Sequence, residues 1–124
     1  MATSALSLTS EAEPTRTAPH NIEIERQLLG AILVNNETFY RVTDFLEPTH
    51  FFVEQHRQIY EKTAHLIRAG KVASPITVKT FFPADAKFGD TPVTQYLLRL
   101  AADATTIINA EDYGRTLMDL ALRR

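Results

Sequence analysis

The sequence contains no cysteine and no tryptophan among its 124 residues, and it has no long apolar run. The absence of cysteine excludes disulfide bonds and thiolate zinc sites, and it is typical of proteins from a reducing compartment. The apolar runs fall well short of the ~18 residues that a membrane-spanning helix needs. The N-terminal segment has no apolar stretch typical of a signal peptide, and Glu11 and Glu13 are unusual in a transit peptide. We therefore expect a cytoplasmic protein that does not bind membranes.

The chain also lacks an excess of positive charge. Thirteen lysine and arginine residues stand against fifteen aspartate and glutamate residues, which gives a formal net charge of −2. Proteins that bind DNA by themselves usually attract its phosphates through clustered basic residues. We therefore expect this chain to bind duplex DNA weakly, if at all, in the absence of other chains.

What the sequence does contain is enough apolar residues, in helical patterns, for one domain. Hydrophobic residues make up 44% of the chain, which can form a core. Residues 1–20 are rich in Ala, Ser, Thr and Pro and predict a disordered N-terminal arm. Residues 21–124 predict an all-α fold, a compact bundle of about six short helices. No stretch has the alternating pattern of a strand, so we expect no sheet.

Start and stop signals place the expected helices. Asn21 is a predicted N-cap for the first helix, and Gly30 inside that helix suggests that a neighbouring helix comes close. Gly70 predicts the end of a helix over residues 54–69, and Asn109 predicts the start of the last helix. The other helices are expected over residues 36–47, around residues 78–82, and from Pro92 onward after a loop over residues 83–91.

No set of residues in the sequence matches a known catalytic or metal site. Residues 65–72 contain a Gly-Lys pair, but His65 stands where a phosphate loop needs glycine and Val72 where it needs Ser or Thr. The four histidines lack the spacing of a zinc site, and His56 or His65 is expected at the edge of the core or in solvent. The carboxylates are expected on helix surfaces. We therefore predict no catalytic, cofactor-binding or metal-binding residue in this chain.

A helix-turn-helix DNA-binding protein, or another stand-alone helical regulator, is the alternative interpretation. The helix over residues 54–69 carries polar residues that a recognition helix uses, namely Gln55, Arg57, Gln58 and Lys62. They are mixed with Glu54 and Glu61, whose negative charge does not suit a DNA groove. A solvated helix face explains the same residues at least as well, so this alternative stays open.

Several short segments of the chain have an order and spacing that are known from one family. They are residues 19–25 with Leu28-Leu29-Gly30, Phe51-Phe52 with residues 56–60, residues 75–78, Tyr96-Leu97 with Leu100, and residues 108–113. Together they resemble the N-terminal domain of bacterial replicative DNA helicases of the DnaB type, over about residues 19–124. The chain departs from the family pattern at Thr77, at Pro83 and at Thr91-Pro92-Val93. The family usually has an acidic capping residue, a longer helix and paired glycines at these places.

The resemblance implies that this chain is the head of a longer protein. Such helicases are hexameric rings driven by a C-terminal RecA-like motor, which uses ATP and Mg²⁺ and is not part of these 124 residues. Their N-terminal domain forms a collar on the ring, stabilises the hexamer, and takes part in recruiting primase and, in some systems, a helicase loader. A helical hairpin follows the head and pairs these domains. We expect the chain to stop within the first helix of that hairpin, at Arg124.

The last helix carries the predicted protein interface. Tyr113, Leu117 and Leu120 fall on one stripe of this helix, and further apolar residues widen the stripe beyond one face. We expect part of this surface to pair with a second copy of the domain, only weakly in this chain because the hairpin is incomplete. The alternative, that these leucines belong to the core of the domain, stays open.

Overall fold

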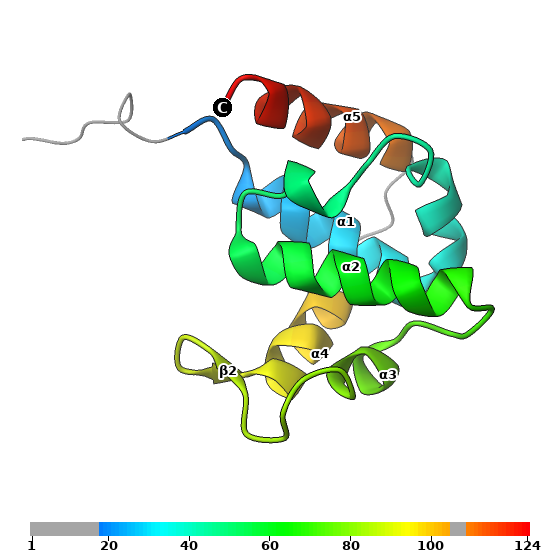
Figure 1. Cartoon of the computed structure of the whole chain (residues 1–124), viewed down its shortest axis with the longest axis vertical. Helices are drawn as coiled ribbons and strands as arrows, with labels where there is room; N and C mark the ends of the chain where they lie inside the picture. Colours follow the sequence, from blue (N-terminus) through cyan, green and yellow to red (C-terminus); the bar gives the residue numbers. More distant parts are fainter. Residues whose placement is uncertain (1–17, 105–108) are drawn as a thin grey trace, which may run out of the picture.

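The computed structural model describes residues 18–104 and 109–124, and most of these residues are helical (Figure 1). In chain order the elements are α1 (Ile22–Val34), the 3₁₀ helices η3 (Asn36–Arg41) and η4 (Pro48–His50), α2 (Glu54–Arg68), α3 (Pro75–Lys79), the strands β2 (Lys87–Phe88) and β3 (Thr91–Pro92), α4 (Val93–Asp103) and α5 (Ala110–Leu122). The predicted all-α fold class is confirmed, apart from the two short strands. Most of the predicted N-terminal arm lies outside the described residues.

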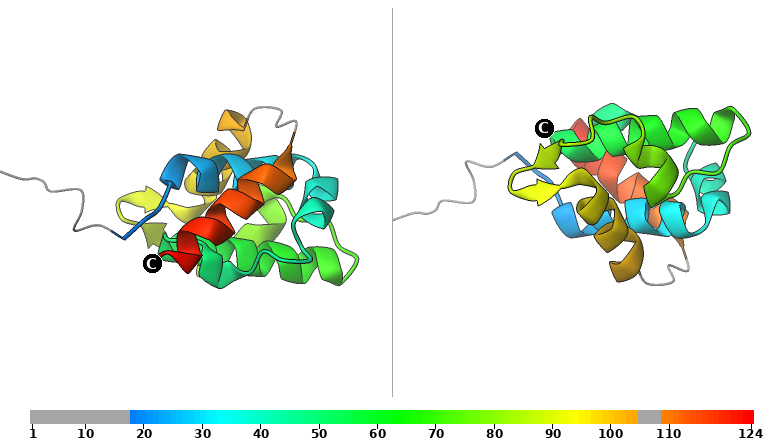
Figure 2. Two further views of the ribbon diagram at one scale, coloured as in Figure 1. Left: turned by 90° about the horizontal axis from the view of Figure 1, so that it is seen from above. Right: turned by 90° about the horizontal axis from the view of Figure 1, so that it is seen from below.

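Helix α1 lies in the middle of the domain. Helix α2 packs along it, α5 and η3 pack on one side of it, and α4 packs on the opposite side (Figures 1 and 2). Helix α3 contacts both α2 and α4, and η4 contacts both α2 and α5. The core therefore surrounds α1, and each of the other helices covers part of it.

The core between these helices is largely apolar. Its biggest fully buried apolar side chains are Tyr60, Phe39, Phe51, Leu28, Leu29, Ile32, Leu46, Ile59, Leu97 and Leu117. Gly30 has the predicted close neighbour, because a Cβ atom at this position would lie 2.2 Å from the backbone oxygen of Leu100 in α4. A side chain here would collide with backbone, so glycine permits α1 and α4 to pack at this distance.

The caps confirm several predicted helix ends. The side chain of Asn21 accepts a hydrogen bond from the amide of Ile24 at 3.1 Å, and that of Asn109 accepts one from the amide of Asp112 at 3.1 Å. Both satisfy amide groups that a first helical turn leaves without partners. Gly70 follows α2 with φ of +78°, a left-handed conformation that glycine adopts without strain.

The prediction of an α-helix over residues 36–47 is wrong. The structure has the short 3₁₀ helix η3 there, followed by turns and by η4, which begins at Pro48. The side chain of Asn36 holds the start of this segment, because it donates to the carbonyl of Ala73 at 2.9 Å and accepts from the amide of Ala73 at 2.9 Å. Three β-branched residues, Thr38, Val42 and Thr43, further disfavour a regular α-helix.

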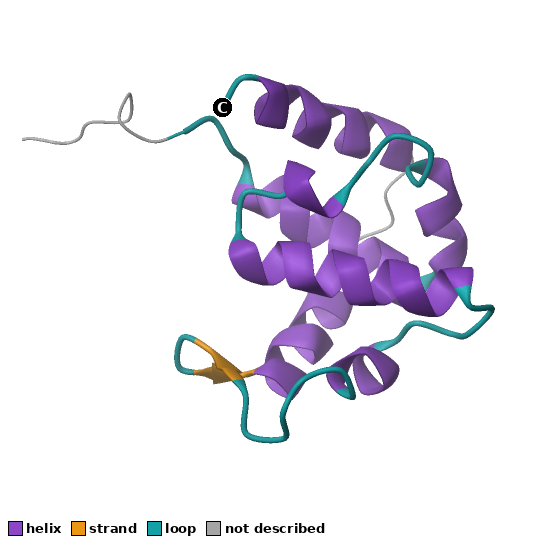
Figure 3. Ribbon diagram, viewed as in Figure 1, coloured by secondary structure: helices purple, strands orange, loops and turns teal. Residues whose placement is uncertain are grey.

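The prediction that the chain has no sheet is also wrong, at one place. Strands β2 and β3 form a two-stranded antiparallel hairpin within the expected loop (Figure 3). Gly89, with φ of +64°, lies in the two-residue turn between them and is followed by Asp90. Thr91 and Pro92 are therefore strand residues, and α4 begins one residue later than predicted, at Val93. The short helix expected around residues 78–82 lies earlier, at Pro75–Lys79.

Candidate functional site

The three residues predicted to form an interface on α5 differ in exposure. Leu117 is 1% exposed and belongs to the core, whereas Tyr113 and Leu120 are partly buried. Tyr113 packs against the core at its edge. The most exposed apolar side chain of the helix is Leu122, at 75%. The apolar surface that α5 leaves open is therefore at its C-terminal end, around Leu120 and Leu122.

Helix α5 is attached to the domain through a buried face that contains two small residues and one leucine. Ala110, Gly114 and Leu117 are buried and lie four and three residues apart, which places them on one face. A Cβ atom at Gly114 would lie 2.8 Å from Cγ1 of Val42 and 3.1 Å from Cζ of Phe45. The buried face of α5 is thus centred on Ala110, Gly114 and Leu117, not on the predicted stripe of Tyr113, Leu117 and Leu120. Two of its three residues are smaller than those of the predicted stripe.

A second feature, which the sequence analysis missed, is a buried carboxylate in α1. Glu25 is 0% exposed, and its two oxygens accept hydrogen bonds from the amide of Phe52 at 2.6 Å and the amide of Val53 at 3.3 Å. These amides lie at the start of α2, whose own N-cap residue, Val53, makes no side-chain cap. Glu25 therefore holds, from another helix, the two amides that directly precede α2, at the positive end of the α2 dipole.

His56 connects this carboxylate to α4. It is 0% exposed, and its Nδ1 lies 2.7 Å from Oε1 of Glu25 while its Nε2 lies 2.6 Å from the hydroxyl of Tyr96. Because a carboxylate only accepts, Nδ1–H donates to Glu25. In the neutral imidazole, Nε2 then accepts from the Tyr96 hydroxyl. We call Glu25, His56 and Tyr96 the buried polar network; it joins α1, α2 and α4.

The positions of Glu25 and His56 correct two expectations. Carboxylates were expected on helix surfaces, and His56 at the edge of the core or in solvent. The helical spacing contained a signal for both. Glu25 lies three, four and seven residues before Leu28, Leu29 and Ile32, and His56 lies in the same way before Ile59, Tyr60 and Thr63. Each polar residue is thus on the buried face of its helix.

The order of carboxylate, imidazole and hydroxyl resembles that of a catalytic triad, but the hydroxyl does not suit a nucleophile. Burial raises the pKa of Tyr96, and the neighbouring Glu25 also raises it, which outweighs the opposite effect of Arg26. The hydroxyl therefore holds its proton more firmly than a free tyrosine does. Both oxygens of Glu25 already accept hydrogen bonds from the amides of Phe52 and Val53, just before α2. The network is built to hold three helices together.

The contacts of α2 bear on the alternative of a DNA-reading helix. Arg57 donates to the carbonyls of Phe51 and Phe52, each at 3.0 Å, and also bonds to Glu54. Gln58 donates to the same glutamate at 3.3 Å. These polar groups stabilise the start of their own helix, as a solvated helix face does, and nothing in this geometry favours a recognition helix.

The arrangement of residues 65–72 does not suit a bound nucleotide. They form the C-terminal end of α2 and the turn after it, where carbonyl groups face outward, whereas phosphates bind at the amide end of a helix. Within residues 18–104 and 109–124, no group of three or more His, Asp or Glu side chains is placed to hold a metal ion. No helix in the same ranges is long and apolar enough to cross a membrane.

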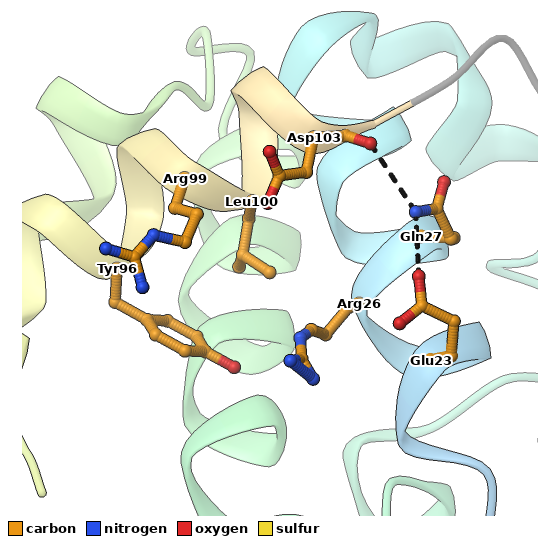
Figure 4. A pocket seen from close by; sticks show the side chains of 7 residues that line it. All are labelled: Glu23, Arg26, Gln27, Tyr96, Arg99, Leu100 and Asp103. Carbon is orange, nitrogen blue, oxygen red and sulfur yellow. Dashed lines mark hydrogen bonds between the residues drawn. The ribbon is translucent and has the colours of Figure 1, made fainter.

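A pocket of about 130 Å³ lies beside the buried polar network, between α1 and α4 (Figure 4). Its lining residues are Glu23, Arg26, Gln27, Tyr96, Arg99, Leu100 and Asp103. The arginines and the tyrosine lie toward one end, and Glu23 lies toward the other with Gln27, which donates to it at 3.0 Å. Both signs of charge are therefore present in one small pocket.

Comparison with known proteins gives consistent matches. Residues 17–119 match the family described as DnaB-like helicase N terminal domain. The chain is 39% identical over 109 residues to the replicative DNA helicase DnaB of Rickettsia typhi, covering 88% of this chain and 22% of that protein. It is 27% identical over 106 residues to the protein of the same name from Pasteurella multocida, covering 86% of this chain and 23% of the relative.

A solved structure agrees with the fold. The crystal structure of the N-terminal domain of DnaB helicase from Mycobacterium tuberculosis superimposes with a TM-score of 0.75, at 24% sequence identity. The match covers 86% of this chain and 77% of that one. The helical arrangement around α1 is thus shared with a known domain, while the curated relatives are more than four times as long as the segment matched here.

Proposed function

The chain belongs to the family of DnaB-like helicase N-terminal domains, and we propose that it is the non-catalytic assembly and partner-docking domain of a hexameric replicative DNA helicase. The family match over residues 17–119 is the observation that carries this proposal. The chain spans 22% of a relative named as a replicative DNA helicase. We therefore assign ATP, Mg²⁺ and DNA unwinding at the replication fork to the rest of the full protein, in the cytoplasm.

The open end of α5 is the surface that we assign to self-association. Leu122 is 75% exposed, and Leu120 is only partly covered by the domain. Leu120 and Leu122 together form an apolar patch at the end of the helix, and contiguous apolar patches mark surfaces where another chain packs. Primase and, in some systems, a helicase loader are the further partners that we propose for this domain.

The experiment uses the full protein that contains this chain. We expect the double substitution Leu120→Asp with Leu122→Asp to lower the fraction of hexamer in sedimentation velocity and to lower the ATP-dependent unwinding of a forked duplex with it. The matched control is Leu98→Asp with Ile76→Asp, which changes two exposed apolar residues away from α5, at 49% and 56% exposure. The control should leave both measurements unchanged.

Two results would contradict the proposal. A full protein that does not unwind DNA with ATP would refute the helicase assignment. A hexamer that resists the α5 substitutions, in a protein that does unwind DNA, would instead remove only the interface. Retention of the purified cognate primase by the immobilised chain tests the docking role separately.

A further inference from the structure

The pocket between α1 and α4 contains two arginines that have no ion-pair partner among residues 18–104 and 109–124. Arg26 follows Glu23 by three residues in α1, and Arg99 precedes Asp103 by four residues in α4. Opposite charges at these spacings commonly pair on a helix surface. In the part of the chain that the structure describes, however, no carboxylate oxygen lies within 4.0 Å of either guanidinium group.

Other arginines that follow a carboxylate by three or four residues do pair with it, as Arg57 does with Glu54 at the spacing of Glu23 and Arg26. Arg115 pairs with Glu111 at 3.3 Å, and Arg123 pairs with Asp119 at 3.0 Å, both four residues apart in α5. The open state of Arg26 is thus a property of this place in the fold, whereas Arg99 precedes Asp103, which is the less favourable order for a pair on a helix. In Figure 4 the side chain of Arg99 lies above the ring of Tyr96 and that of Arg26 lies beside the Tyr96 hydroxyl, with Leu100 between the two arginines.

The pocket is also preformed. The hydroxyl of Tyr96 lies 2.6 Å from Nε2 of His56, which fixes the ring that forms one wall. Gly30 holds α1 against the backbone of α4, so the two helices that line the pocket cannot move closer. A ligand would therefore meet walls that are already in place, which lowers the entropic cost of binding.

We propose that Arg26 and Arg99 bind a carboxylate side chain of a partner polypeptide in this pocket. The planar guanidinium group matches a carboxylate through paired hydrogen bonds, and two of them on one anion add charge neutralisation. This inference rests on the docking role proposed above, and it names the chemistry of one contact within that role.

The acidic residues of the pocket favour a polypeptide over a nucleic acid. Glu23 and Asp103 bring negative charge close to the two arginines, and the whole chain has a net charge of −2. A phosphate backbone is negative along its whole length and would be repelled there. A polypeptide can present an acidic side chain to the arginines and an amide or a basic side chain to the carboxylates.

The test measures amide chemical shifts of the ¹⁵N-labelled 124-residue chain by NMR. The probe is N-acetylglutamate methylamide, compared at equal ionic strength with its neutral analogue N-acetylglutamine methylamide and with inorganic phosphate. We expect saturable shifts around Gln27 and Leu100 with the carboxylate probe alone. Arg26→Gln and Arg99→Gln should each weaken this binding roughly tenfold, the loss expected for one charge-assisted hydrogen bond. Arg123→Gln, which removes the same charge from the far end of α5, should leave it unchanged.

Each of the other outcomes overturns the proposal. Equal shifts with the neutral analogue would show that the carboxylate is not recognised, and undiminished binding by the arginine variants would show that the anion lies elsewhere. Tighter binding of phosphate than of the carboxylate probe would assign the pocket to a phosphate-bearing ligand. Because these substitutions leave Leu120 and Leu122 in place, their failure is distinguishable from a failure of the α5 interface or of the helicase assignment.

Discussion

Two helix contacts in this domain differ in composition. One joins α1 to α2, and the other joins α5 to the rest of the domain. The first contains a buried polar network, in which Glu25 accepts from two amides and one imidazole. The second has Ala110, Gly114 and Leu117 on its inner face and leaves Leu122 exposed. A buried network with specific partners fixes one arrangement of the helices. An apolar face that stays open can still accept another chain.

This difference indicates that the contact between α1 and α2 is rigid, whereas α5 leaves a surface on which another chain can pack. Removing one member of a satisfied buried network leaves its partners without hydrogen bonds, which is costly. Changing a side chain that already faces solvent costs little within the same chain. The two regions should therefore respond very differently to single substitutions, and this contrast can be measured.

The largest effect is expected for Glu25→Ala. This substitution leaves two amides at the start of α2 and the imidazole of His56 without their acceptor, and it removes the negative charge from the positive end of that helix. We expect the free energy of unfolding to fall by about 3–5 kcal/mol, measured by urea denaturation. The control is Glu23→Ala, one carboxylate on the exposed part of the same helix, which should change it by less than about 0.5 kcal/mol. Similar losses for the two variants would contradict the expected difference between the buried Glu25 and the exposed Glu23.

A smaller loss is expected for Gly30→Ala. Alanine usually improves a helix by about 1 kcal/mol relative to glycine, but here its Cβ would collide with the backbone oxygen of Leu100. Because backbone cannot move aside as a side chain can, we expect a net loss of about 1–3 kcal/mol. At Gly114 the nearest atoms are side-chain atoms of Val42 and Phe45, so Gly114→Ala should cost less. Thermal or urea unfolding of the two variants decides this, and the reverse order would mean that α5 is the more tightly packed helix.

Three helix ends, at Asn21, Gly70 and Asn109, were predictable because local chemistry sets them. Asn21 and Asn109 accept hydrogen bonds from amides of their own helix, and Gly70 adopts a left-handed conformation that suits glycine. None of these features depends on distant residues. The segment from residue 36 to residue 47 was not predictable in the same way. Its conformation depends on a bond from Asn36 to Ala73, which is far away in sequence.

The candidate sites were predicted less well than the fold. Leu117 could be placed on an apolar stripe, but spacing alone does not tell an inner face from an outer one, and the structure buries it. Glu25 and His56 had the spacing of core residues. Their polar character pointed to the surface, and only the meeting of three helices supplies the partners that permit burial. The pocket between α1 and α4 likewise needs the packing of two helices that are far apart in sequence.

Alkaline pH provides a further test, because the ionisation of buried tyrosines changes the free energy of unfolding only at high pH. Burial raises the pKa of Tyr60 and that of Tyr96 above the value near 10 of an unfolded chain. Above pH 10 the unfolded chain therefore loses these protons first, and the free energy of unfolding falls as the pH rises toward the folded-state pKa. The tyrosines thus stabilise the fold fully below pH 10. Urea titrations above pH 9 should show this decline, and Tyr96→Phe should make it shallower. An equal slope in that variant would show that Tyr96 ionises alike in both states.

The smallest effect on the chain itself is expected at the open end of α5. Leu120→Asp and Leu122→Asp place charges where the domain leaves the side chains partly or largely exposed, so each should change the free energy of unfolding of the 124-residue chain by less than about 0.5 kcal/mol. Leu117→Ala, three residues before Leu120, should instead cost about 2–5 kcal/mol, because it leaves a cavity in the core. Urea denaturation of the three variants separates the two faces of one helix. A large loss at Leu120 would mean that the domain itself uses this residue, and would leave Leu122 as the remaining apolar contact for a second chain.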